Sequence, residues 1–510
     1  CHYCPVKFSK DLSYALVEVN KQSIYRHSFT AEYKAIDLTS SVRKAQIISV
    51  RDQYYDSIRK VNKPKTIKRF RYAQFGSNQA SVVLFSGSQI FYLKSPFSKN
   101  FIKISESRTE NPYIYSGIPD WVYEEEILES NEATWFSEDG NFIAWAEFND
   151  KDVSIMEIPK YIPNSDRGLT FNDIPQYPIQ LSIPYPKPGT KNPTVRLFLT
   201  DFRVSDEDDQ NENDDERVRR HSKKQPSNRV TRQVQRSKKF NNYEIQAPSP
   251  TMTLLFNVIF TKTSIISIWS NRIQNEAIIS ECSLQDTNNC KILHNLVNYK
   301  GWIDYLNKPI VVDEVSGRKF FVNAFQNFNR IIDLNQKTAL TPGNFHVKKI
   351  LGVVSLNQQD QLKDRKIIYQ GYSTDLDQES NKLGQGIHIY MMDINQTENF
   401  RRHCITCDYA TNIYDILISS GDINPKLPEK YKICRNFDGE LLKNVNDAEN
   451  AENAENSSKI NVMKLSCKGP GVPFDLIYNF EDRKIVKVLT NNRNLQTLLK
   501  KYFLNKSNIT

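Results

Sequence analysis

The chain has 510 residues, of which 39% are hydrophobic and 25% charged, and its formal net charge at pH 7 is +9. Its 27 Phe and 25 Tyr suit a large core built from strands. No apolar run reaches the roughly 18–20 residues that span a bilayer, which excludes a membrane-spanning helix within this sequence.

The positive charge does not indicate nucleic-acid binding. Residues 206–216 hold eight acidic residues and no base, whereas residues 217–239 hold ten Lys or Arg and no acid. Together they net only +2, so +7 is spread over the rest of the chain. No aromatic residues alternate with bases as a stacking surface would require. We therefore expect no nucleic-acid partner.

Strand patterns dominate the chain, and one local pattern recurs. Short apolar runs, each followed by a polar turn and an alternating strand, predict hairpins at residues 8–19, 83–93, 134–148 and 311–325. Repetition at intervals near 50 residues is typical of β-propeller blades. An all-β sandwich array is the alternative. Long amphipathic helices are hard to find, which argues against an α/β enzyme domain within these residues.

Two segments depart from this pattern. Residues 203–240 contain almost no large apolar residues and are predicted to be a disordered insertion. Residues 443–458 form a low-complexity loop in which Ala-Glu-Asn is repeated three times. We assign residues 1–490 to the repeated β-domain and residues 491–510 to a connector.

The sequence contains no recognisable catalytic centre. It has no G-x-S-x-G, Walker-A or H-E-x-x-H pattern, and its seven His are scattered without ligand spacing. Two C-x-x-C pairs, Cys1/Cys4 and Cys404/Cys407, lie too far apart to favour a zinc ribbon, so we expect no metal and no cofactor.

Sequons and cysteines point to an oxidising compartment with structural disulfides. Tripeptides that fit N-glycosylation begin at Asn395, Asn456, Asn505 and Asn508.

Two short stretches carry chemistry that could bind a ligand. The first is Glu124-Glu125-Glu126, within "DWVYEEEIL", and the second is Tyr25-Arg26-His27-Ser28. A solvated helix face is the simple interpretation of an acidic run, and a cage for a cation is the alternative. A lone Arg is most often a surface charge.

Several longer motifs resemble one family. They are "YRHSFTAEY" at 25–33, "GIPDWVYEEEIL" at 117–128, "ATWFSEDGNFIAWAEFND" at 133–150, "IPYPKPGTKNPTVRLF" at 183–198, "NRIQN" at 271–275, "GW" at 301–302 and "CKGPGVPF" at 467–474. In this order they resemble the propeller of the dipeptidyl peptidase IV family, in the prolyl oligopeptidase clan of serine peptidases. The resemblance runs from about residue 8 to about residue 500.

The resemblance implies an eight-bladed β-propeller, incomplete at its N-terminus, from which the family's C-terminal α/β-hydrolase domain and catalytic triad are missing. Such a propeller would gate peptide substrates and hold their free N-terminus for release of dipeptides. It also implies a homodimer and an extracellular protein, either secreted or of the type II cell-surface class, with an anchor outside this chain. The alternative function is that of a non-enzymatic relative, a binding protein or ion-channel auxiliary subunit.

The resemblance assigns roles to individual residues. The family's two substrate-binding glutamates correspond to Glu125 and Glu126, and its substrate-orienting arginine corresponds to Arg26. Two carboxylates suit an α-ammonium group, which has three N–H donors and no acceptor. We expect Arg26 to balance their charge before a substrate arrives. No residue of the chain is assigned a catalytic role.

Other positions agree with the family or depart from it. The family's disulfides imply the pairs Cys282–Cys290, Cys404–Cys407 and Cys434–Cys467. A Phe-Arg pair of the family's substrate pocket is replaced by Leu306 and Asn307. The insertion at 203–240 follows a strand pair at 183–202 that reaches toward the dimer partner in the family, so we expect it to alter or block dimerisation.

Overall fold

The computed structural model describes residues 5–39, 44–56, 61–76, 80–105, 111–161, 177–203, 240–304, 308–356, 364–373, 386–395, 402–407, 417, 421, 434–442, 462–469, 471–479 and 484–506. The insertion at 203–240, the loop at 443–458, Cys1, Cys4, Leu306 and Asn307 lie wholly or almost wholly outside these ranges. The chain divides into two compact units, residues 1–301 and residues 302–510.

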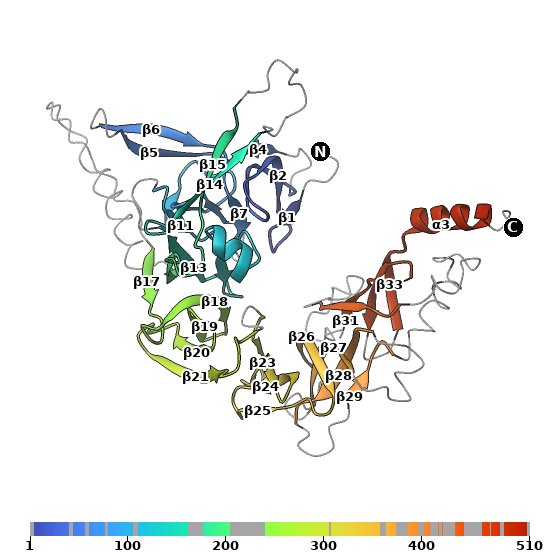
Figure 1. The fold of residues 1–510 in the computed structure, drawn as a ribbon. Helices are drawn as coiled ribbons and strands as arrows, with labels where there is room; N and C mark the ends of the chain where they lie inside the picture. Colours follow the sequence, from blue (N-terminus) through green and yellow to red (C-terminus); the bar gives the residue numbers. More distant parts are fainter. Residues whose placement is uncertain are drawn as a thin grey trace, which may run out of the picture. The chain divides into compact units, whose positions relative to one another are not determined.

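The first unit contains four antiparallel sheets that follow one another along the chain (Figure 1). The first sheet has the order β1 (Val6–Phe8), β2 (Tyr14–Ser23), β3 (Phe29–Asp37), β4 (Ala45–Ile47). The second has the order β10 (Ile102–Lys103), β9 (Ile90–Leu93), β8 (Val82–Phe85), β7 (Tyr72–Phe75). The third contains β11 (Ile114–Ser116), β13 (Phe142–Asn149), β16 (Thr194–Asp201) and β17 (Asn241–Ile245), with β12 (Thr134–Phe136) paired to β13. The fourth has the order β18 (Met252–Phe260), β19 (Ser264–Asn271), β20 (Glu276–Ser283), β21 (Cys290–Val297).

Two further hairpins belong to this unit. They pair β5 (Val50–Asp56) with β6 (Val61–Ile67), and β14 (Ile155–Lys160) with β15 (Ile179–Pro184). We expect residues 183–202 to form a strand pair with each other. The structure shows that they do not. The first residues of this segment end β15, which pairs with β14, and the remainder forms β16, which pairs with β13 and β17.

The second unit contains three four-stranded antiparallel sheets, each in chain order. They consist of β22 (Val311–Val312), β23 (Lys319–Phe325), β24 (Phe328–Asp333) and β25 (Thr338–Ala339); of β26 (Phe345–Ser355), β27 (Arg365–Ser373), β28 (His388–Asp393) and β29 (Arg402–Cys404); and of β30 (Phe437–Leu441), β31 (Val462–Cys467), β32 (Phe474–Asn479) and β33 (Lys484–Thr490). A helix, α3 (Arg493–Lys506), lies where we expected a connector.

All four predicted hairpins are present, as β1–β2, β8–β9, β12–β13 and β22–β23. Two of these hairpins have turns of the same kind. Ser9 Oγ donates to Asp11 and accepts the N–H of Tyr14, and Ser137 Oγ donates to Asp139 and accepts the N–H of Phe142. The Phe-Ser-x-Asp sequence thus fixes both turns through the same side-chain bonds, because Ser and Asp satisfy backbone groups that a turn leaves free.

Neighbouring sheets pack face to face, which explains why central strands are apolar on both sides. All four residues of β8 are buried, as are seven of the eight in β13 and in β19. One core cluster joins the first and second sheets, and another joins the second and third; two more connect the three sheets of the second unit. Small sheets stacked in chain order in this way are typical of propeller blades. Seven such sheets occur in the described residues, and a total of eight blades stays a prediction.

Candidate functional site

The acidic run folds as a short π-type helix, Tyr123–Ile127, between β11 and β12. The N–H of Leu128 closes it by donating to the carbonyl of Tyr123 at 2.8 Å, five residues back. At its start, Asp120 Oδ2 accepts the N–H of Val122 at 3.0 Å. Tyr123 and Ile127 are buried, so they fasten the turn to the core and fix which way the glutamates point.

The three consecutive glutamates have three different environments. Glu124 is fully buried, and its Oε1 accepts the backbone N–H groups of His27 and Ser28, each at 2.7 Å. The Glu125 side chain is 15% exposed. Glu126 is exposed, and within the described part of the chain no hydrogen bond or ion pair involves its carboxylate. Glu124 is therefore a structural residue, whereas Glu125 is partly exposed and Glu126 is exposed.

The loop that carries Arg26 joins β2 to β3 in the first sheet. Its backbone is closed by the N–H of Ile24, which donates to Ser28 O at 2.9 Å, and is tied down by Glu124. Arg26 Nη1 lies 3.6 Å from Glu125 Oε2, while the Arg26 side chain is 73% exposed. The structure thus brings Arg26 and Glu125 together across two sheets, on a fixed loop but through a loose, solvated ion pair.

A pair of buried acids lies near the glutamates. Asp120 and Asp150 are both 1% exposed. Burial raises the pKa of Asp120 well above its usual value, and the nearby charge of Asp150 raises it further. Burial raises the pKa of Asp150 to about 7. Both oxygens of Asp150, and Asp120 Oδ1, have no hydrogen-bond partner in the part of the chain that the structure describes.

A partly buried basic residue, Arg71, lies close enough to Glu124 for their charges to interact. Burial lowers the pKa of Arg71, and the negative charge of Glu124 opposes that effect. The ring of Tyr115 lies under the Arg71 guanidinium, with 6.0 Å between the guanidinium carbon and the ring centroid. Burial raises the pKa of the Tyr115 hydroxyl. The three glutamates of the turn outnumber the two arginines beside it, Arg26 and Arg71, so an outside cation would be attracted to the turn.

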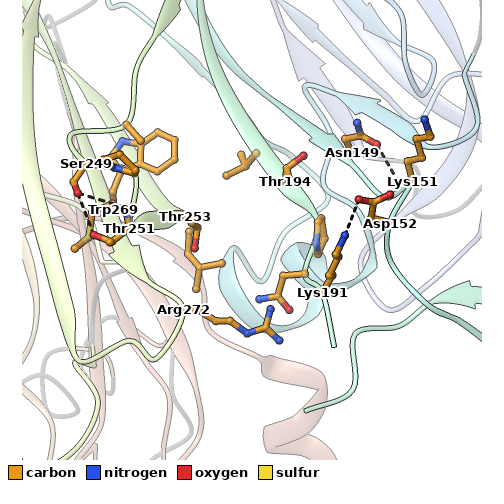
Figure 2. A pocket seen from close by; sticks show the side chains of 17 residues that line it. Asn149, Lys151, Asp152, Lys191, Thr194, Ser249, Thr251, Thr253, Trp269 and Arg272 are labelled. Atoms are coloured by element: carbon orange, nitrogen blue, oxygen red, sulfur yellow. Dashed lines mark hydrogen bonds and ion pairs between the residues drawn. The ribbon is translucent and has the colours of Figure 1, made fainter. Parts of the chain in front are cut away.

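A cavity lies elsewhere in the first unit. It measures about 900 Å³ and is bordered by the third and fourth sheets. Figure 2 shows Lys151, Asp152 and Lys191 on one side and Ser249 and Trp269 on the other, and Lys191 Nζ lies 3.1 Å from Asp152 Oδ2. Neither Glu125, Glu126 nor Arg26 lines it. Its basic rim does not suit an ammonium group, so we treat the glutamates as a separate site.

The other sequence predictions can be placed only in part. The structure contains the three expected disulfide bonds, Cys282–Cys290, Cys404–Cys407 and Cys434–Cys467. Of the sequon residues, Asn395 is exposed at the end of β28, Asn505 lies in α3, and Asn456 and Asn508 fall outside the described residues. Glycosylation stays a prediction. No described helix combines the length and the apolar character needed to cross a membrane.

The structural role of Glu124 is not apparent from its sequence, but a signal exists. In a helical turn, residues three and four apart share a face, so Tyr123 and Ile127 mark the buried side of this segment. Successive residues point in different directions, and three adjacent glutamates therefore cannot all face a ligand. That geometry separates Glu124 from its two neighbours.

Comparison with known proteins agrees with the fold. The family model for the dipeptidyl peptidase IV (DPP IV) N-terminal region matches residues 9–424. The chain is 25% identical to prolyl endopeptidase FAP of Bos taurus, over 98% of this chain and 53% of that protein. It is 24% identical to dipeptidyl peptidase 4 of Sus scrofa, over 96% and 52% of the two chains.

A solved structure also matches. The crystal structure of Porphyromonas gingivalis dipeptidyl peptidase 4 superposes with a TM-score of 0.60 at 17% identity, covering 97% of this chain and 53% of that one. The chain thus spans about half the length of the relatives that it matches. The sheets fit a β-propeller, and the chain belongs to the family of the dipeptidyl peptidase IV N-terminal region.

Proposed function

We propose that this chain is a substrate-binding propeller that holds the free N-terminal ammonium group of a peptide between Glu125 and Glu126. The observation that carries the proposal is the fixed position of Glu124. By binding the His27 and Ser28 amides, it sets the Arg26 loop against the turn, with Arg26 beside the partly exposed Glu125.

The chemistry suits an α-ammonium group. Three N–H donors on one nitrogen can be shared by two carboxylates through charge-assisted hydrogen bonds, each contributing about 1.5–3 kcal/mol. The Arg26–Glu125 pair is long, at 3.6 Å, and its Arg26 side chain is exposed, so an incoming ammonium can replace Arg26 at small cost. Arg26 would then be available to donate to a peptide carbonyl oxygen.

The clamp acts by positioning rather than by chemistry. An ammonium held at a fixed point would place the peptide bond after the second residue at a constant distance from the clamp, which favours release of dipeptides. We therefore propose that a longer protein containing this chain is a dipeptidyl-peptidase-type serine exopeptidase, extracellular and dimeric. A non-enzymatic peptide-binding protein would use the same clamp, and hydrolysis of a dipeptide substrate by the longer protein distinguishes the two.

Binding to the chain itself tests the clamp. Calorimetry with a short peptide, free or acetylated at its N-terminus, is expected to show binding of the free form only. Glu125→Gln and Glu126→Gln should each weaken that binding by about 10-fold or more, the equivalent of one charge-assisted hydrogen bond. Glu129→Gln is the matched control, since it removes the same charge from an exposed acid just beyond the turn. Equal binding of both peptides would refute the proposal.

A further inference from the structure

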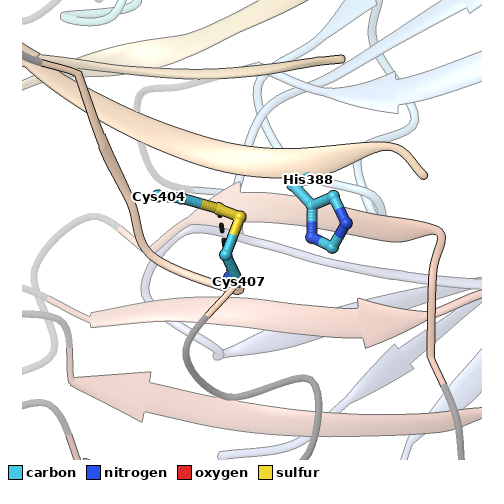
Figure 3. Close-up of side chains that lie close together, drawn as sticks. All are labelled: His388, Cys404 and Cys407. Carbon is cyan, nitrogen blue, oxygen red and sulfur yellow. Dashed lines mark hydrogen bonds between the residues drawn. A yellow bond between two sulfur atoms is a disulfide. The ribbon is translucent and has the colours of Figure 1, made fainter. Parts of the chain in front are cut away.

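A buried histidine lies beside a disulfide in the second unit. His388 is the first residue of β28, and Cys404 is the last residue of β29, the strand paired with it. One ring nitrogen of His388 and the Sγ atoms of Cys404 and Cys407 lie within 4.8 Å of one another. Figure 3 shows the imidazole next to the disulfide. Strand pairing creates this cluster, which the scattered histidines of the sequence do not reveal.

Hydrogen bonds hold the histidine and the cysteine turn together independently of the S–S bond. Thr406, which is fully buried, accepts the N–H of Ile389 at 3.1 Å, and its hydroxyl oxygen lies 3.1 Å from His388 Nδ1. The N–H of Ile405 donates to Ile389 O at 2.8 Å. Opening the disulfide would therefore leave both sulfurs near the imidazole.

The surroundings favour thiolates and a neutral imidazole. The N–H of Cys407 donates to Cys404 Sγ at 3.0 Å, and a hydrogen bond to sulfur stabilises its negative charge. His388 is 4% exposed, and imidazole binds metal ions in its neutral form. Cys404 and Cys407 are half-buried, which leaves the sulfurs within reach of a small reductant and of an ion.

We propose that Cys404, Cys407 and His388 form a Zn²⁺ site when the Cys404–Cys407 disulfide is reduced. Two thiolates, one imidazole and a water molecule complete a four-coordinate zinc shell of the Cys₂His type. The second C-x-x-C pair of a zinc ribbon is not needed, because the third protein ligand comes from β28.

Atoms and electrons balance when the disulfide is converted to the zinc-binding dithiolate. A thiolate of an external dithiol attacks one sulfur, which breaks the S–S bond, forms a mixed disulfide and releases one protein thiolate. The second thiol of the reductant then displaces the other protein thiolate and closes the reductant's own disulfide, so two electrons pass to the protein. Zn²⁺ binding releases the thiol protons to solvent.

Loss of this disulfide should destabilise the second unit less than loss of its other disulfide, Cys434–Cys467. The Cys404–Cys407 bond closes a loop with a sequence separation of only 3, so it restricts the unfolded chain less than a long cross-link does. By contrast, Cys434–Cys467 has a separation of 33, and both cysteines are 1% exposed. Loss of the Cys404–Cys407 bond is therefore compatible with a folded second unit.

The experiment titrates the whole chain with dithiothreitol, locates free thiols by alkylation and peptide mass analysis, removes the reductant and adds Zn²⁺. We expect one Zn²⁺ per chain, bound only after Cys404 and Cys407 are reduced. Replacing both cysteines by Ser should abolish uptake, and His388→Leu should weaken it by on the order of 100-fold. His403→Leu, which alters the neighbouring histidine of β29 outside the cluster, should leave it unchanged.

X-ray absorption of the zinc-loaded wild type provides a readout that does not depend on whether the variants fold. The expected shell has two sulfurs at about 2.3 Å and nitrogen or oxygen at about 2.0–2.1 Å. Three outcomes would overturn the proposal: no uptake by chain reduced at Cys404 and Cys407, unchanged uptake by folded His388→Leu, or a zinc shell without two sulfur ligands.

Discussion

Glu124 gives the sharpest test of how the candidate site is built. Its Oε1 accepts two backbone N–H groups, from His27 and Ser28, at 2.7 Å each, in a fully buried position. Glu124→Ala would leave both amides without a partner, at about 1–3 kcal/mol each, so we expect a loss of about 2–6 kcal/mol in the free energy of unfolding. Glu124→Gln keeps an acceptor oxygen in the same place and should lose clearly less.

Urea unfolding of the chain, followed by fluorescence of its five Trp, measures these differences. Glu126→Ala is the control, because an exposed side chain of this kind changes stability by no more than about 0.5 kcal/mol. Glu124→Ala should also weaken binding of a free peptide N-terminus, since it releases the Arg26 loop. The reasoning fails if Glu124→Ala unfolds within 0.5 kcal/mol of the control, or if Glu124→Gln is as harmful as Glu124→Ala.

Three further predictions concern the interior. Because the folded pKa of Asp150 is raised to about 7, from an ordinary value near 3.9, protonation favours the folded state, and stability falls as pH rises from about 4 to 7. Asp150→Asn should flatten that fall; equal pH profiles of unfolding would contradict it. The buried Arg365–Asp313 ion pair joins β27 to the β22–β23 turn, and Arg365→Ala should lower the free energy of unfolding by about 3–5 kcal/mol. A thermal shift no larger than that of an exposed Arg→Ala change would rule this out. Gly117 has φ +73°, and a Cβ there would lie 2.5 Å from the Phe85 ring, so Gly117→Ala should lower the melting temperature measurably, whereas Gly189→Ala, equally strained but in open space, should cost less.

The sequence predicts the local parts of this fold well. The four hairpins are predictable because each combines an alternating strand with a polar turn, and in two of them Ser and Asp side chains make bonds within a few residues. The sequence predicts less well which strands pair when they lie far apart along the chain. The segment 183–202 was expected to form one strand pair, yet its strands pair with β14 and β13, which lie earlier in the chain.

In the candidate site, too, some features can be predicted from the sequence and others cannot. The resemblance to the dipeptidyl peptidase IV family groups Glu125, Glu126 and Arg26 as residues that could hold a cation, and the structure places Arg26 beside Glu125. Sequence could not show that Glu124 faces inward, because that depends on the packing of Tyr123 and Ile127 against other strands. The proximity of His388 to the cysteine turn likewise depends on sheet pairing, which local sequence does not encode.

The bond between Glu124 and the Arg26 loop has a thermodynamic consequence. It joins backbone and side chain 97 residues apart in the sequence, so the two halves of the clamp belong to separate sheets of the first unit. A peptide held by both halves would bind the folded unit and not the unfolded chain. By linkage, it should stabilise that unit by about 2.7 kcal/mol at a concentration 100 times its Kd. A peptide bound by this clamp thus connects two sheets, and its binding can be followed as a rise in the melting temperature of the chain.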